Sequence, residues 1–299
     1  MIHNAFVSVC MITYNQEAFI RQAIEGVLIQ KCDFDYHLII CEDASTDKTG
    51  DICQQYADQD PQRVSYFRND KNIGIGPNLF GALKKVSGEF IAFCEGDDYW
   101  TDPYKLQKQI NFLKQNAEFN ICYHKVRILL QDGSLVDDFL MRVPGSETNI
   151  DDLIRFGNYI HTASVVYRNN FTIPEWLCHC PIADYPLNLL SVRNGKIKYL
   201  DEFMSVYRFG VGMYCNWSSI NKRIKHFVTI NELIKNYPDR RIRRSLILKQ
   251  RLDYLSLLKN FLFGKMSLSD LKFITSMFIS TEIKHISPSP TNDSALINS

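Results

Sequence analysis

Apolar residues in the first 115 positions follow two alternating spacings. Short runs in which most residues are apolar predict buried strands, and segments with apolar residues three or four apart predict helices. The predicted strands are residues 6–13, 36–41, 64–67 and 89–94. The predicted helices are residues 17–30, 45–57, 76–86 and 103–113. This order predicts an α/β fold in which helices cover both faces of a mainly parallel sheet.

The pattern loosens after residue 120. We expect a hairpin turn at Asp132-Gly133 and a mobile loop over 141–149. The remaining elements of this region are predicted strands at 164–167, 197–200 and 204–207 and a helix at 183–192. Residues from 222 onward have helical spacing, and a tail rich in Ser, Pro and Asn, which we expect to be disordered, begins at about 287.

Composition narrows the class of protein. The 299 residues are 45% hydrophobic and 22% charged, which excludes a disordered chain, a collagen-like repeat and a small disulfide scaffold. The nine cysteines are scattered without paired metal-binding spacing. No apolar run reaches about 18 residues, and no basic segment precedes the first apolar run. We therefore expect a cytoplasmic protein with reduced thiols and no spanning helix.

The formal net charge of +1 conceals an asymmetry. Residues 1–221 hold 20 Lys and Arg against 27 Asp and Glu, whereas residues 222–299 hold 14 against 6. Basic charge beside apolar helical spacing in 222–265 suits an anionic membrane surface. The alternative is an ordinary helical extension with solvated charges. Nucleic acid is a weaker candidate, because the body is acidic and carries no binding motif.

Polar clusters follow three of the predicted strands, at residues 13–15, 42–43 and 95–98. In an open parallel sheet the ligand crevice lies at the carboxyl ends of the strands. Glu95, Asp97 and Asp98 would repel one another, and a divalent cation such as Mg²⁺ or Mn²⁺ would remove that repulsion. The alternative interpretation is an acidic turn exposed to water. Residues 45–47 are also suited to capping a helix, with Ser45 or Thr46 as the cap.

Four segments, at residues 7–15, 42–47, 69–74 and 88–98, resemble in order and spacing the inverting glycosyltransferase family 2. The resemblance extends over about residues 5–212. It implies the GT-A fold, a nucleotide-diphospho-sugar donor, commonly a UDP-sugar, and a divalent metal, Mn²⁺ or Mg²⁺. It divides the catalytic domain, residues 1–221, into a donor-binding half of about 1–115 and an acceptor-binding half of about 116–221. Residues 222–299 form a separate basic helical region.

The resemblance also implies roles for donor-binding residues. Thr13, Tyr14 and Asn15 correspond to the first donor-binding strand end, and Asp43 corresponds to the residue that recognises uracil. Glu95-Gly96-Asp97 corresponds to the family's DxD motif, with Glu in place of the first Asp. Asp97 would then bind the metal, Glu95 would lie near the metal and the ribose, and Asp98 would be the following acidic residue of the donor site.

On the acceptor side, the resemblance implies that Asp184 is the catalytic base. It precedes a helix and a strand ending in Tyr207-Arg208, as in the family, although Ala183 replaces the usual Glu before it. Asp201 and Glu202 are rivals, which we expect to face water at a turn between two strands. The His that many relatives carry after Tyr-Arg is replaced here by residues 209–212. Trp100 and His161 are weaker candidates for contact with an acceptor sugar, and a core role is the alternative for each.

The resulting hypothesis is an inverting, metal-dependent glycosyltransferase acting on a glycan or lipid-linked glycan. The expected setting is bacterial surface polysaccharide synthesis, such as lipopolysaccharide O-antigen or capsule, at the inner face of the plasma membrane. Two alternatives are a sugar nucleotidyltransferase, whose Gly-rich basic phosphate loop is absent from residues 13–16, and a non-catalytic protein of the same fold that binds nucleotide-sugars or tethers to membranes.

Overall fold

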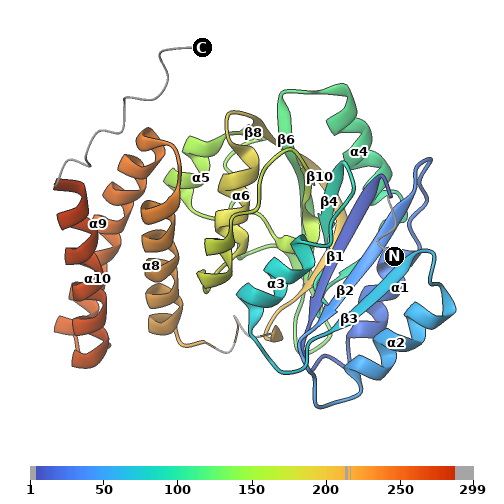
Figure 1. Ribbon diagram of the computed structural model, residues 1–299, viewed down its shortest axis with the longest axis horizontal. Coiled ribbons are helices and arrows are strands. Elements are labelled where there is room, and N and C mark those ends of the chain that lie inside the picture. The colour runs from blue at the N-terminus through green and yellow to red at the C-terminus, as the bar shows by residue number, and fades with distance from the viewer. Residues whose placement is uncertain (1–4, 213–214, 216, 287–299) are drawn as a thin grey trace, which may run out of the picture. The chain divides into compact units, whose positions relative to one another are not determined.

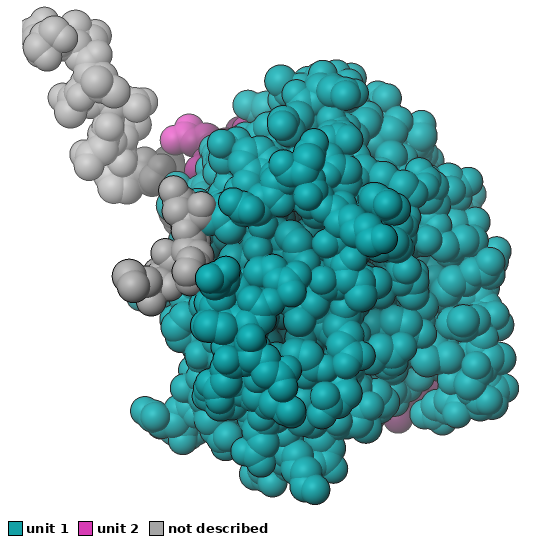
Figure 2. Space-filling model, turned by 90° about the vertical axis from the view of Figure 1, so that its right-hand side faces the viewer, with its two compact units in different colours: residues 1–217 teal, residues 218–299 magenta. Residues whose placement is uncertain are grey.

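The computed structural model describes residues 5–212, 215 and 217–286. The predicted tail from about 287 lies outside the described residues. Backbone contacts divide the chain into two compact units, residues 1–217 and residues 218–299, which are coloured separately in Figure 2.

A central sheet organises the first unit (Figure 1). Its strands are β1 (Val7–Thr13), β2 (Tyr36–Glu42), β3 (Val64–Arg68), β4 (Phe90–Phe93), β5 (Tyr99–Trp100), β6 (Phe119–Leu129), β7 (Leu135–Asp137), β8 (Glu147–Thr148), β9 (Val166–Arg168) and β10 (Lys196–Arg208). The main order is β3-β2-β1-β4-β9-β6-β10-β5, with β7 paired to β6 and β8 paired to β10. The two longest pairings, β1 with β2 and β6 with β10, are parallel. Beyond β4 the sheet is mixed, because β9 is antiparallel to both of its neighbours.

Helices cover both faces of the parallel part, as the sequence predicted. They are α1 (Ile20–Leu28), α2 (Thr49–Gln59), α3 (Ile75–Leu83) and α4 (Lys105–Gln115). Side chains alternate between the faces of a strand. On one face, Leu38 and Ile40 of β2 join the core formed with α1, α2 and α4, while on the other Ile39 and Cys41 pack against Ala82 of α3. Burial on both faces explains why these strands are apolar throughout.

The second half of this unit completes the sheet with shorter helices. These are α5 (Ile150–Phe156), α6 (Asp184–Val192) and two short 3₁₀ helices, η1 (Thr162–Ser164) and η2 (Glu175–His179). The capping box at Asn149 and Asp152 fixes the start of α5. The hairpin at Gly133 has a φ of 85°, which a glycine adopts without steric cost.

Some predicted boundaries differ from the structure. Residues 197–200 and 204–207 belong to one continuous strand, β10, whose pairing with β6 shifts register between Leu200 and Ser205. A β-bulge absorbs the polar residues there without ending the strand. Helix α2 begins at Thr49 rather than at Ser45 or Thr46, and its N-cap is Lys48. Ser45 instead accepts a hydrogen bond from the Asn15 N–H at 2.9 Å. The predicted loop at 141–149 contains the short strand β8.

The second unit consists, within its described residues, of α8 (Ser219–Asn236), α9 (Arg240–Leu262) and α10 (Leu268–Ile286). Its core contains Phe227, Leu257 and Ile274, and the rings of Tyr254 and Phe278 stack at 4.2 Å. Ser218 and Asp239 cap α8 and α9 by accepting backbone hydrogen bonds. Among the described residues, no helix combines the length and apolar character needed to cross a bilayer.

A glycine allows α1 to pack closely on β5. A Cβ at Gly26 would lie 2.8 Å from both the N and the O of Trp100, whereas a Cβ at Gly81 of α3 would meet nothing within 4 Å. We expect Gly26→Ala to lower the free energy of unfolding by about 1–3 kcal/mol, because backbone atoms cannot move aside without strain. Gly81→Ala, the control, should raise it by about 0.5–1 kcal/mol. Urea unfolding of both variants measures the difference, and equal stability would contradict this packing.

Candidate active site

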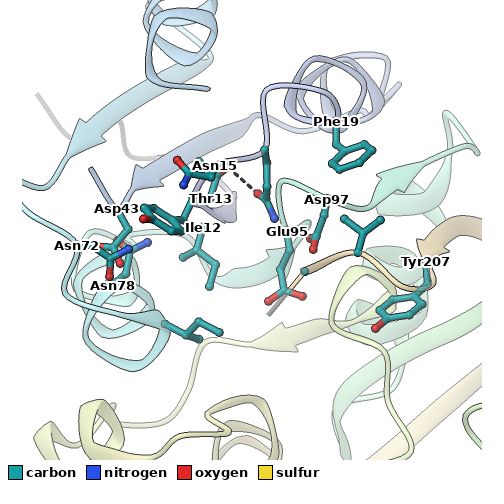
Figure 3. Close-up of a pocket in the computed structure, with 15 residues that line it drawn as sticks. Ile12, Thr13, Asn15, Phe19, Asp43, Asn72, Asn78, Glu95, Asp97 and Tyr207 are labelled. Atoms are coloured by element: carbon teal, nitrogen blue, oxygen red, sulfur yellow. Dashed lines mark hydrogen bonds between the residues drawn. The ribbon is translucent and has the colours of Figure 1, made fainter. Parts of the chain in front are cut away.

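A cavity of about 390 Å³ opens at the carboxyl ends of β1, β2 and β4 (Figure 3). Its lining includes six residues that were predicted to bind the donor, namely Thr13, Tyr14, Asn15, Asp43, Glu95 and Asp97. Other candidates, Asp98, Trp100, His161 and Asp184, do not belong to this lining. The parallel strands explain the convergence, because their carboxyl ends share one edge of the sheet.

Reciprocal hydrogen bonds join the loops that follow β1 and β2. The Asn15 side chain accepts from the Thr46 N–H at 2.8 Å. Glu17 contributes in both directions: its N–H donates to Asp47 at 3.1 Å and its carboxylate accepts from the Lys48 N–H at 2.9 Å. Asn15 has a φ of 51°, a conformation that Asn tolerates better than most residues. These bonds fix one wall of the cavity.

Asp43 is held by the loop between β3 and α3. Its Oδ1 accepts from the Asn69 side chain and from the Ile73 N–H, both at 2.9 Å, and its Oδ2 accepts from the Gly74 N–H at 2.8 Å. A carboxylate oxygen has two acceptor positions. Among the described residues, Oδ2 accepts one hydrogen bond. It can therefore accept a second one from an N–H or O–H group of a ligand in the cavity.

Glu42 precedes Asp43 but has a structural role. Its side chain is fully buried, accepts from the Ser45 N–H and the Tyr66 hydroxyl, and pairs with Arg68 at 3.3 Å. Adjacent residues at the end of a strand point in opposite directions. The polar cluster at 42–43 therefore contributes one residue to the cavity and one to its support.

The carboxylates of Glu95, Asp97 and Asp98 each offer an oxygen within 4.8 Å of the others. Burial, together with Asp97 and Asp184, raises the pKa of Glu95 to about 8. Burial also raises the pKa of Asp97 and, with its two acidic neighbours, that of Asp98. Oxygen-rich, mutually repelling groups are what a hard divalent cation neutralises. These three carboxylates are therefore suitable ligands for Mg²⁺ or Mn²⁺.

Asp98 lies behind the cavity rather than in its lining. It is 2% exposed, and its Oδ1 accepts from the Arg208 N–H at 2.9 Å. The Arg208 guanidinium donates to the Asp97 carbonyl oxygen and to Gln22 and lies 4.6 Å from the Tyr99 ring. Arg208 thus places a positive charge beside the acidic cluster. The donor contact expected for Asp98 does not fit this buried position, where its carboxylate anchors the end of β10.

Gln16 and Arg208 were absent from the predicted site residues. Gln16 lines the cavity and accepts from the Thr13 hydroxyl at 2.7 Å, and its side chain favours the charged form of Asp97 by lowering the pKa of that carboxyl. The available signal for Gln16 was its position directly after Asn15. The available signal for Arg208 was its place in the Tyr207-Arg208 pair. Neither signal shows which side chain meets an acidic group about 80 or 110 residues away.

Two glycines allow the backbone to approach the acidic cluster. A Cβ at Gly96 would lie 2.6 Å from the hydroxyl oxygen and 2.9 Å from the Cβ of Thr13, so the Thr13 side chain leaves no room for one. Gly212 has a φ of 79°, and a Cβ on it would collide with the Asp97 carboxylate. Gly212 belongs to residues 209–212, which replace the His that many relatives carry after Tyr-Arg.

Asp184 is the first residue of α6. Its Oδ2 accepts from the Asn158 side chain at 2.7 Å, and its Oδ1 accepts from the Tyr185 N–H at 2.8 Å. Burial raises the pKa of Asp184, and its charge in turn contributes to the raised pKa of Glu95. The rivals Asp201 and Glu202 are exposed and pair with Lys125 and Lys108.

Trp100 supports the site from the core. It is 2% exposed, its indole N–H donates to the Ala163 carbonyl at 2.8 Å, and the Lys105 ammonium lies 4.0 Å from its ring. The expected contact with an acceptor sugar does not fit this burial. The core alternative does, because both faces of the ring are enclosed by protein.

His161 lies between two cavities. It hydrogen-bonds to Asp138 at 2.9 Å, and its ring packs 5.0 Å from that of Tyr207, which lines the main cavity. His161 itself lines a second cavity of about 100 Å³, walled in part by Tyr159 and Tyr199. Tyr207 thus lines the first cavity and His161 lines the second, and their rings are in contact.

A model of the family described as Glycosyl transferase family 2 matches residues 8–170, more than half of the chain. The chain belongs to glycosyl transferase family 2. The matched segment contains β1, β2 and β4 with the polar clusters that follow them. The resemblance seen in the sequence is confirmed.

Relatives of this family 2 member come from several bacteria. The uncharacterized protein Rv1520 of Mycobacterium tuberculosis is 38% identical over 202 residues, which are 68% of this chain and 58% of that protein. TuaG of Bacillus subtilis, named for teichuronic acid biosynthesis, is 33% identical over 148 residues, or 49% of this chain and 56% of TuaG. The chain therefore spans less than two thirds of the length of these relatives.

Solved structures show the same fold at low identity. S. aureus TarS 1–349 in complex with UDP has a TM-score of 0.63 at 18% identity, covering 94% of this chain and 82% of TarS 1–349. The mannosyltransferase PcManGT from Pyrobaculum calidifontis, in complex with GDP-Man and Mn²⁺, has a TM-score of 0.54 at 13% identity, covering 95% and 88%. These likenesses confirm the predicted α/β glycosyltransferase fold.

Gly212 offers a test of the acidic cluster in this family 2 protein. We expect Gly212→Ala to weaken Mn²⁺-dependent UDP binding by about 10–100-fold, because the new Cβ displaces the Asp97 carboxylate. Gly133→Ala is the matched control, since Gly133 also has a positive φ, 85°, but faces open space. Both variants should lose about 1–3 kcal/mol of stability from backbone strain. Calorimetry that finds equal UDP affinity in the two variants would refute the role of Gly212.

Proposed function

We propose that this chain is an inverting, cation-dependent glycosyltransferase that moves a sugar from a UDP-sugar to a glycan or lipid-linked glycan. The arrangement that carries the proposal is the meeting of the acidic cluster with Asp184, close enough for their charges to interact. Synthesis of a bacterial surface polysaccharide such as O-antigen or capsule is the proposed setting. The naming of TuaG for teichuronic acid biosynthesis supports it.

Asp43 favours uracil over guanine as the donor base. Oδ2 retains one acceptor position, which matches the single imide N–H of uracil. Guanine presents two adjacent N–H donors to a carboxylate and would require a second acceptor position on the same edge. The UDP complex of TarS agrees with this choice, whereas PcManGT binds GDP-Man.

Asp97 and Glu95 are the proposed ligands of Mn²⁺ or Mg²⁺. A cation held there supplies a Lewis acid for the charge that develops on the departing diphosphate. The Gln16 side chain favours the charged form of Asp97, and Arg208 adds a fixed positive charge beside the cluster. The glycine at 212 leaves room for the carboxylate itself.

Asp184 is the proposed base. The acceptor hydroxyl oxygen forms a bond to the anomeric carbon, the bond from that carbon to the diphosphate oxygen breaks, and the hydroxyl proton passes to Asp184. One displacement of this kind inverts the configuration. A pKa raised by burial makes Asp184 a better proton acceptor than an exposed carboxylate. Hydrogen bonds from Asn158 and the Tyr185 N–H orient its two oxygens.

The acceptor is proposed to approach from the side of His161. Tyr207 closes the donor cavity there, and the second cavity behind the His161–Tyr207 pair is walled by tyrosines. Aromatic walls with a few polar groups are typical of sugar-binding surfaces. In this arrangement His161 orients the acceptor while Asp184 takes its proton.

Replacement of the base tests the mechanism. We expect Asp184→Asn to slow sugar transfer or donor hydrolysis by about 10²–10⁴-fold, because the amide cannot accept the proton. UDP affinity should be unchanged, since Asp184 lies outside the donor cavity. Release of UDP from a panel of UDP-sugars with Mn²⁺ measures the rate.

Asp201→Asn, at an exposed rival position, should retain wild-type turnover. Wild-type turnover by Asp184→Asn would remove the base assignment. Tight UDP binding without turnover of any donor by the wild-type protein would instead favour the non-catalytic alternative.

Removal of Asp97 tests the cation site. Calorimetry should show that Asp97→Ala loses Mn²⁺-dependent UDP binding, whereas Asp58→Ala, on the exposed side of α2, binds as the wild type does. Cation binding must displace the proton that a pKa of about 8 places on Glu95, so wild-type Mn²⁺ affinity should rise as the pH approaches that value. Asp97→Ala should remain folded, since it relieves like-charge repulsion. Unchanged Mn²⁺-dependent affinity in Asp97→Ala would exclude this site.

A further inference from the structure

Helix α9 exposes an unusual set of side chains. Every exposed position of this helix holds either a leucine or a cation. These nine positions are Arg240, Arg241, Arg244, Leu248, Arg251, Leu252, Leu255, Lys259 and Leu262. We refer to them as the α9 face. Phe263, 74% exposed, follows directly after the helix.

The α9 face is too apolar for a surface that meets only water. Its leucines are 60–79% exposed, which is far from the burial that leucine usually finds in a folded protein. They lie at spacings of four, three and seven residues, so they project from the same side of the helix. The opposite side, with Leu246 and Leu257, is buried within the unit. The exposed leucines are therefore a second apolar surface, separate from the core.

The charge on the α9 face has one sign. Asp253, the acidic residue within α9, is not on this face and lies 3.5 Å from His226 of α8. Arg251 is paired with Glu282 of α10 at 2.7 Å. No position of the α9 face holds a carboxylate, so the face itself is positively charged. A partner surface must therefore combine negative charge with room for several leucine side chains.

We propose that the α9 face docks on an anionic membrane surface. The leucines would enter the boundary between headgroups and acyl chains, and the Arg and Lys side chains would extend to the lipid phosphates. Both requirements are met at once, because an anionic bilayer presents negative charge over an apolar interior. A lipid-linked acceptor lies at the same surface, and this link to function is the part that rests on the proposed function.

Two other occupants fit less well. A second copy of α9 would bring arginines against arginines, and like charges at a contact oppose association. A nucleic acid would satisfy the cations but would leave the leucines in water. An anionic bilayer provides a suitable environment for both the leucines and the cations of the α9 face.

Vesicle flotation of the full chain without substrate tests the proposal. The probes are vesicles of pure phosphatidylcholine and vesicles in which roughly one third of the lipid is phosphatidylglycerol. We expect binding to the anionic vesicles to exceed binding to neutral ones by about 10-fold or more, and to weaken with salt. The double variant Leu252→Ser/Leu255→Ser should lose about 10-fold in binding, and so should Arg244→Glu/Lys259→Glu.

Leu135→Ser is the matched control for the leucines, because Leu135 is 53% exposed but belongs to β7 of the other unit. Lys71→Glu, in the loop before α3, is the control for charge. Circular dichroism shows that each variant is folded. Absence of wild-type binding, or equal binding by the leucine variant, would overturn the proposal. The proposal would also be overturned if the leucine variant or the charge variant changed the oligomeric state in light scattering but left vesicle binding unchanged. UDP binding, measured separately, reports on the proposed function whatever the vesicles show.

Discussion

Repulsion among three carboxylates is the constraint around which the catalytic region is organised. Glu95, Asp97 and Asp98 lie together at the end of a buried strand, with Asp98 buried and the other two half-buried at the cavity. The fold limits this cost by neutralising charge through raised pKa values, by a backbone hydrogen bond to Asp98, and by the Arg208 guanidinium. The arrangement remains suited to binding a cation, because no Lys or Arg of the described residues forms an ion pair with Glu95 or Asp97.

Strand β10 links several parts of the first unit. It is parallel to β6 over most of its length, pairs with β5 beside the acidic loop, and ends in Tyr207 and Arg208. Tyr207 therefore lines the cavity at the strand ends while Arg208 anchors the acidic loop. Since both residues extend from one hydrogen-bonded strand, one wall of the cavity and the charge beside the acidic cluster are positioned together.

The sequence predicted strand ends better than side-chain directions. Apolar strands followed by polar residues placed Asp43, Glu95 and Asp97 correctly at one edge of the sheet. Periodicity could not show that Glu42 turns inward, or that Arg208 meets Asp98 at a separation of 110 residues. It also divided β10 in two, because a bulge with exposed acidic residues has the same local pattern as a turn. Contacts between distant segments determine all three of these features.

The paired loops after β1 and β2 have a consequence for selectivity. Asn15, Glu17 and their backbone partners hold that wall of the cavity in place through bonds made within the protein. A nucleotide arriving there does not have to order the wall, so little of its binding free energy is lost to conformational entropy. A nucleotide base that does not fit this wall cannot improve its contacts, because the wall does not rearrange around it. The donor side acts as a fixed template, and a change of nucleotide preference would require new side chains rather than a new loop conformation.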